Sequence, residues 1–66
     1  MDFIEKAKLR LESWITHNEH HQEDYDEFIQ QLEAAGKHKS SKHVREMMAL
    51  TVQSTECLKK ALKALG

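Results

Sequence analysis

The fold is decided by residues 11–35, which read LESWITHNEHHQEDYDEFIQQLEAA. Apolar side chains recur here in alternating steps of three and four, and the pattern extends back to residue 4. This spacing is typical of a helix that packs against partner helices in a left-handed bundle. The ten positions are Ile4, Ala7, Leu11, Trp14, Asn18, His21, Tyr25, Phe28, Leu32 and Ala35. Eight of them are apolar or aromatic, and the two polar ones are adjacent and central, so the sequence predicts one long helix with a polar layer in its packing face.

Capping residues indicate where this first helix begins and ends. Asp2 is a suitable N-cap for a helix over about residues 3–35. Gly36 suits the left-handed conformation that ends many helices, and a turn is expected over residues 36–40. Residues 16–18 have modest helix propensity, so the helix is either continuous or broken there.

A second helix is expected over about residues 41–65, with Ser40 or Ser41 as its N-cap. Its expected packing positions are Val44, Met47, Thr51, Ser54, Leu58, Ala61 and Leu65. In an antiparallel hairpin, residues whose numbers add to about 76 would lie side by side. The middle of this helix then places Thr51, Ser54 and Thr55 against the layer of His17, Asn18 and His21.

The same register leaves the start of the first helix without an opposing partner. Ile4, Leu9 and Leu11 would then need a second subunit. We therefore expect an all-α protein, a long antiparallel helical hairpin that self-associates into a four-helix bundle, with a homodimer as the favoured form.

Composition narrows the class of protein. The 66 residues include 39% hydrophobic side chains, two glycines and no proline, which indicates a single domain, over residues 1–66, that is almost entirely helical. The formal charge is -1 and neither sign forms a long block, which argues against nucleic-acid and membrane partners. Residues 1–14 resemble neither a signal peptide nor a membrane span. The single cysteine, Cys57, fits a reducing compartment, so we expect a cytoplasmic protein.

The strongest candidate site is a histidine pair. His17 and His21 are four residues apart, so they lie on one helix face one turn apart, with Asn18 beside them. This spacing can supply two ligands to a divalent transition metal such as zinc, nickel or cobalt. Two histidines fill at most half of a tetrahedral shell, so carboxylates, water or a second copy must supply the rest. Two copies related by an axis near this layer would supply four nitrogens.

Other residues near the pair are expected as auxiliary partners, and each also has a plain structural interpretation. The candidates are Asn18, His20, Asp24, Tyr25 and Thr55. His20 with Asp24 equally fits a solvated helix face, and Trp14, Tyr25 and Phe28 are expected in the core. The whole polar layer also fits a role in fixing helix register without any metal, as buried polar residues do in coiled coils.

The run L-x-x-W-x-x-H-N-x-x-H, from Leu11 to His21, with Phe28 and a closing Leu58-x-x-Ala61-Leu62, resembles a small prokaryotic helical-hairpin domain of unknown function. The resemblance spans about residues 8–65. It implies a domain found alone or appended to other proteins, some of them handling nickel or cobalt, and so a possible metal-handling protein partner. Members often carry Ala-Asn-Glu in the second helix, where Glu56 matches and is a further auxiliary candidate.

Catalytic interpretations find little support. No glutamate stands three residues before a histidine, as helical di-metal sites require, and there is no glycine-rich loop for a nucleotide. We therefore expect a non-enzymatic protein for metal binding, storage or delivery. The alternative is a structural or protein-interaction module with the same layer.

Overall fold

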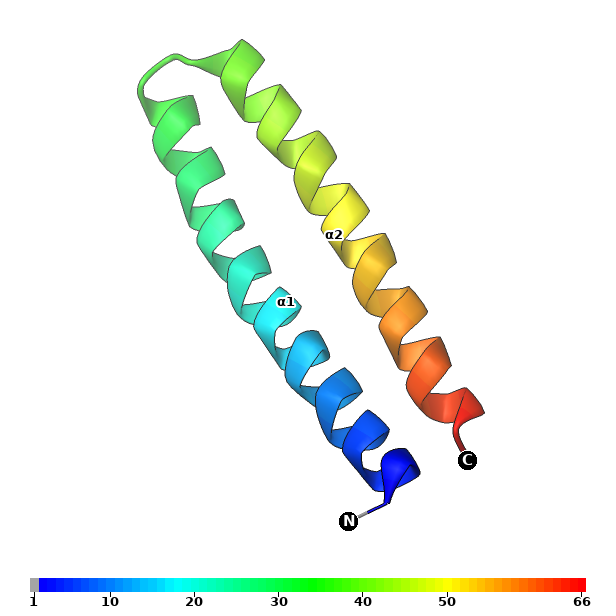
Figure 1. Ribbon diagram of the computed structural model, residues 1–66. Coiled ribbons are helices and arrows are strands. Elements are labelled where there is room, and N and C mark those ends of the chain that lie inside the picture. The colour runs from blue at the N-terminus through cyan, green and yellow to red at the C-terminus, as the bar shows by residue number, and fades with distance from the viewer. Residues whose placement is uncertain (1) are drawn as a thin grey trace.

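The computed structural model describes residues 2–66, and it consists of two antiparallel α-helices joined by a short turn (Figure 1). The helix α1 spans Phe3–Ala34 and α2 spans His38–Ala64. The start of α1 and the end of α2 lie at the same end of the hairpin, opposite the turn, and the molecule measures 51 × 16 × 11 Å (Figure 1). The prediction of an all-α helical hairpin is confirmed.

The first helix begins where its cap predicts and runs without a break. The Asp2 carboxylate accepts a hydrogen bond from the backbone N–H of Glu5 at 2.8 Å, which satisfies one of the free donors of the first turn. The helix then continues through residues 16–18 for a total of 32 residues. Packing along the whole length of α2 therefore outweighs the modest propensity of that segment.

The turn is closed by a Schellman motif. Gly36 adopts a φ of +74°, its N–H donates to the Glu33 carbonyl at 3.0 Å, and the Lys37 N–H donates to the Leu32 carbonyl at 2.9 Å. Only glycine adopts this left-handed conformation without steric cost, so the expected role of Gly36 is confirmed.

The expected start of α2 is wrong by about three residues. The helix begins at His38 with Lys37 at the N-cap, and neither Ser40 nor Ser41 caps it. Ser41 is buried inside the first turn, where its hydroxyl donates to the Glu33 carboxylate of α1 at 2.8 Å. The serine side chain that we expected to cap the helix instead joins the two helices.

The predicted packing face of each helix consists of two columns, each a set of residues spaced seven apart. In each helix one column faces the other helix as predicted, and the other column does not. On α1, the column of Leu11, Asn18, Tyr25 and Leu32 is half-buried as expected, and Leu11, which the register had left for a second subunit, is already partly covered within the hairpin. The second column between the helices is Lys8, Ile15, Gln22 and Ile29. The expected column of Ala7, Trp14, His21 and Phe28 lies to one side of the contact, and Trp14 and Phe28 are 51% and 49% exposed rather than in the core.

The second helix shows the same rotation. Val44, Thr51, Leu58 and Leu65 face α1 as expected, whereas the accompanying column is Ser41, Met48, Thr55 and Leu62. The expected residues Met47, Ser54 and Ala61 are exposed. Each helix has three neighbouring columns that are suitable for packing, and a single partner helix covers only two of them. The heptad pattern does not show which two are covered.

Contacts between the helices support the expected register. The carboxylate of Glu19 lies 3.8 Å from the Lys59 ammonium, and that of Glu33 lies 3.3 Å from the Arg45 guanidinium. Both pairs fall within two residues of the register in which residue numbers add to about 76. The central layer of α1 therefore lies beside the central layer of α2.

Candidate metal site on the side of α1

The candidate site is built by a single helix. His17 is exposed and His21 is half-buried, one turn apart on α1. Their Nε2 atoms are 2.8 Å apart, and the two rings meet edge to face at 86° with centroids 4.3 Å apart. The helix therefore brings the two Nε2 atoms within hydrogen-bonding distance of each other.

This contact is a hydrogen bond in which one Nε2–H donates to the other Nε2 lone pair. If both rings carry their proton on Nδ1 instead, both Nε2 lone pairs point at the same point and can bind one cation. Two nitrogens bound to one zinc ion in a tetrahedral shell lie about 3.3 Å apart. Small side-chain rotations would widen the present 2.8 Å to that separation.

Tyr25 lies with its ring beside the second imidazole. Its ring stacks on His21 at a centroid distance of 5.7 Å and an interplanar angle of 17°. The three side chains lie at successive turns of α1, with Tyr25 stacked on His21 and His21 meeting His17 edge to face. A stacked neighbour restricts the rotamers of His21 and so prepares the pair for a ligand.

The remaining expected auxiliary residues do not complete a ligand shell with the pair. His20, Asp24 and Glu56 are exposed, and Asn18 lies half-buried between the helices. Across residues 2–66, no group of three or more His, Cys, Asp or Glu side chains is placed to hold a metal ion. The pair is thus a two-donor site.

The hydroxyl groups of α2 use their protons within their own helix. The Thr55 hydroxyl is buried and donates to the Thr51 carbonyl at 3.0 Å, and the Thr51 hydroxyl donates to the Met47 carbonyl at 3.1 Å. These hydroxyls can still accept a hydrogen bond from a neighbouring side chain, but they are no longer donors. The polar residues of the two helices therefore lie at the same level, but the hydroxyl groups of α2 donate their hydrogen bonds to the backbone of α2 itself.

A second polar cluster lies at the turn and is not among the residues that the sequence predicts as a site. The Glu33 carboxylate accepts hydrogen bonds from the Ser41 hydroxyl at 2.8 Å and from Arg45 at 3.3 Å, and it lies 2.6 Å from Nδ1 of His38. The Ser41 hydrogen bond, followed by those of His38 and Arg45, lowers the pKa of Glu33. The acid three residues before Gly36, with a serine and an arginine early in the second helix, is the sequence signal that could have found this cluster.

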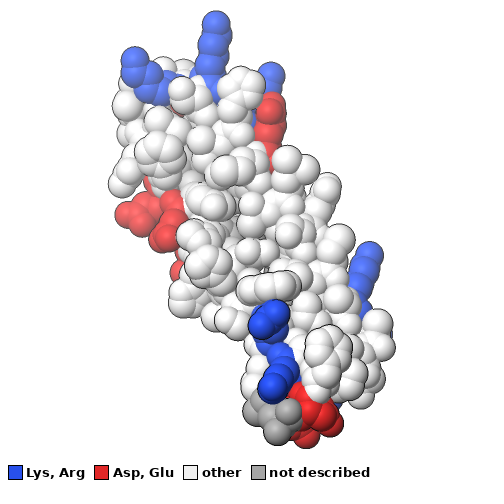
Figure 2. All heavy atoms as spheres, viewed as in Figure 1, with Lys and Arg blue, Asp and Glu red and all other residues white. Residues whose placement is uncertain are grey.

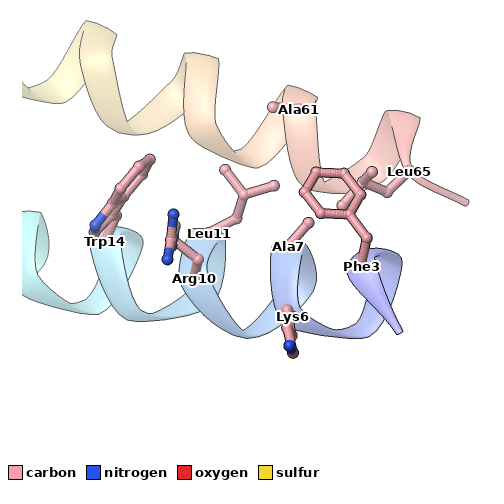
Figure 3. A pocket seen from close by; sticks show the side chains of 8 residues that line it. All are labelled: Phe3, Lys6, Ala7, Arg10, Leu11, Trp14, Ala61 and Leu65. Atoms are coloured by element: carbon pink, nitrogen blue, oxygen red, sulfur yellow. The ribbon is translucent and has the colours of Figure 1, made fainter. Parts of the chain in front are cut away.

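An apolar groove opens at the end that holds both termini (Figure 3). It has a volume of about 360 Å³ and is lined by Phe3, Lys6, Ala7, Arg10, Leu11, Trp14, Ala61 and Leu65. The side chains of Phe3, Ala7 and Leu11 point toward α2, while Lys6 points away from it (Figure 3). The groove is thus apolar at its floor and carries cationic side chains along the α1 edge.

Comparison with protein families adds a classification. Residues 7–65 match the family described as Domain of unknown function (DUF8180). The chain belongs to this family. The resemblance noted in the sequence is confirmed to the extent of a small domain of unknown function. The DUF8180 match includes the histidine pair, the turn, all of α2 and all of α1 except its first four residues. Comparisons with curated proteins and with solved structures find no match.

One further observation concerns membranes. Neither helix of the DUF8180 hairpin, within the described residues, combines the length and the apolar character needed to cross a bilayer.

Proposed function

We propose that this protein binds a divalent transition metal through the Nε2 atoms of His17 and His21. The observation that carries the proposal is the 2.8 Å separation of these two atoms, which lie one helical turn apart on the same face of α1. Neutral imidazole is a ligand for zinc, nickel and cobalt alike, so the pair itself does not choose among them. The Tyr25 stack on His21 supports the proposal because it limits the ring motion that a ligand would otherwise have to arrest.

The proposed role is binding, storage or delivery of the metal rather than catalysis. As the partner we propose a metal-handling protein, because the resemblance implies that some domains of this kind accompany proteins that handle nickel or cobalt. The lone Cys57 supports a cytoplasmic location, because cysteine without an intramolecular disulfide partner is usual in reducing compartments.

The experiment is a titration of chelator-free, untagged protein with zinc, nickel and cobalt, followed by calorimetry. Uptake is expected for the wild type and is lost in the double variant His17→Ala/His21→Ala. The matched control is His20→Ala, which removes an exposed imidazole from the same helix without touching the pair. Equal binding by all three proteins would show that the pair is not the site.

A second candidate function is a protein-interaction module, and the exposed aromatic side chains favour it. Phe3, Trp14 and Phe28 all stand on the surface of α1. In this function the histidine layer sets orientation without metal. Replacing both His17 and His21 with Leu should then leave stability equal or higher and change the choice of partner, whereas the metal-binding function predicts loss of metal uptake.

A further inference from the structure

The side of the hairpin that carries the histidine pair also carries four of the eight large apolar side chains that are exposed in the described part of the chain. We call this the outward face, and it consists of Phe3, Ala7, Trp14, His21 and Phe28 on α1 with Met47 and Ala61 on α2. Trp14 and Ala61 line the same groove, which places the two sets on one side of the molecule (Figure 3). In Figure 2 this side shows charged side chains mainly at the ends and edges, with an uncharged middle that spans both helices.

The exposed area is too large for a chain of this mass. The accessible surface is 5180 Å². A compact monomer of 7.7 kDa is expected to expose about 4,300 Å², so the excess is roughly 900 Å². A stable interface buries about 800 Å² per partner. Moreover, Ile29 is the single buried apolar side chain in the described part of the chain, so the hairpin alone has very little core.

We propose that a second copy of this chain covers the outward face, with the two α1 helices antiparallel and the two-fold axis at the level of His17 and His21. The four imidazoles of the two copies then surround one metal ion. This inference rests on the proposed metal binding and names the partner that completes the site.

The spacing of the aromatic residues supports this position of the axis. Trp14 and Phe28 each lie seven residues from His21, about 10 Å along the helix on either side. If the two-fold axis lies midway between His17 and His21, Trp14 of one chain lies at the level of Asp24 of the other, about one helical turn before Phe28. Both large aromatic side chains are then covered while the histidines meet at the centre.

Charge favours the antiparallel direction. Lys6 and Arg10 lie on the early part of α1, and Asp24 lies beyond the pair on the same edge. An antiparallel copy brings Arg10 within about one helical turn of Asp24 of the second copy. A parallel copy would instead place each residue beside its own like charge.

The coordination argument is independent of packing. Within residues 2–66 the chain offers no third His, Cys, Asp or Glu donor beside the pair. A tetrahedral zinc site needs four ligands, and two copies of an incomplete two-nitrogen site supply them. The predicted stoichiometry is one metal ion per two chains.

Native mass spectrometry with zinc tests the shared site. The wild type is expected to give two chains with one zinc ion. Trp14→Ala should dissociate the dimer and weaken zinc binding at least tenfold, whereas Leu9→Ala removes a similarly exposed apolar side chain outside the outward face and should change neither. The double variant His17→Ala/His21→Ala should lose zinc but retain a metal-free dimer.

Two other results separate the possible failures. One zinc ion per chain, unaffected by Trp14→Ala, would overturn the shared site and leave metal binding by the pair intact. Absence of zinc from every form would overturn the shared zinc site, and absence of nickel and cobalt as well would overturn the metal-binding function itself.

A cross-linking experiment tests the direction of the helices. In a Cys57→Ser background, Ser13→Cys combined with Asp24→Cys places two thiols about 16 Å apart along one helix, too far for an intramolecular disulfide. The proposed antiparallel dimer brings the two positions of different chains to the same level, so mild oxidation should give a covalent dimer. Each single replacement should remain monomeric on a denaturing gel. Cross-linking of the single variants instead would indicate a parallel pair and overturn the proposal.

Discussion

Ile29 is the residue on which the hairpin depends most, because it is the one large apolar side chain that the described residues bury completely. Ile29→Ala should lower the free energy of unfolding by about 2–4 kcal/mol, since it removes buried methyl groups and leaves a cavity. Chemical unfolding followed by circular dichroism measures this. Phe28→Ala, which alters the half-exposed neighbour, should lower it by less than half as much when the chain is dilute enough to be monomeric. Equal losses would mean that Ile29 is not the centre of the core.

Glu33 gives the hairpin a dependence on pH. Its hydrogen bonds with Ser41, His38 and Arg45 lower its pKa from the ordinary value of 4.5, so the folded state favours the carboxylate. The stabilisation is complete above the ordinary pKa and is lost as pH falls from there through the lower folded pKa. The melting temperature should therefore drop between about pH 5 and pH 3. Glu33→Gln should flatten this part of the profile, and the exposed Glu27→Gln should not; an unchanged profile in Glu33→Gln would contradict the assignment.

At the scale of elements, the turn depends on Gly36. Its φ of +74° is unfavourable for any residue with a Cβ atom. Gly36→Ala should destabilise the hairpin by about 1 kcal/mol, and Gly36→Asn by less, because asparagine tolerates this conformation better. Thermal unfolding of the three proteins under one set of conditions measures the order. The open space around the glycine means that a larger loss cannot come from a steric clash of the new Cβ.

The sequence predicts the two helices and most of their ends well, but it predicts poorly which side of each helix faces the other. Asp2 and Gly36 mark helix ends through local chemistry, which a sequence contains in full. Whether Trp14 or Ile15 faces α2 depends instead on how many partners the helix has. The heptad through Trp14 and Phe28 describes a helix with more than one neighbour, and the isolated hairpin provides only one.

The polar sites are likewise predicted only in part by the sequence. The spacing of His17 and His21 predicts that they meet on one face, and the structure brings their Nε2 atoms to 2.8 Å. The Tyr25 stack also follows from a regular helix. The Glu33 cluster does not, because the sequence favours Ser41 as a capping residue, and the contact of its hydroxyl with Glu33 depends on the geometry of the turn.

For the whole molecule, metal should act as a stabilising ligand. A metal that binds only the folded form adds about 2.7 kcal/mol at a free concentration one hundred times its dissociation constant. Zinc is therefore expected to raise the melting temperature of the wild type, and a chelator should reverse the rise. His17→Ala/His21→Ala should show neither effect, whereas a similar rise in that variant would locate the zinc elsewhere.

The antiparallel path in Figure 1 also determines the order in which the contacts can form. Glu33 and Ser41 are separated by eight residues, whereas Glu19 and Lys59 close a loop of forty. The entropic cost of closing the longer loop from an unfolded chain is greater by about 1.4 kcal/mol. The hairpin should therefore zip from its turn and fray from its open end, so that amide hydrogens near Phe3 and Leu65 exchange with solvent long before those near Ile29.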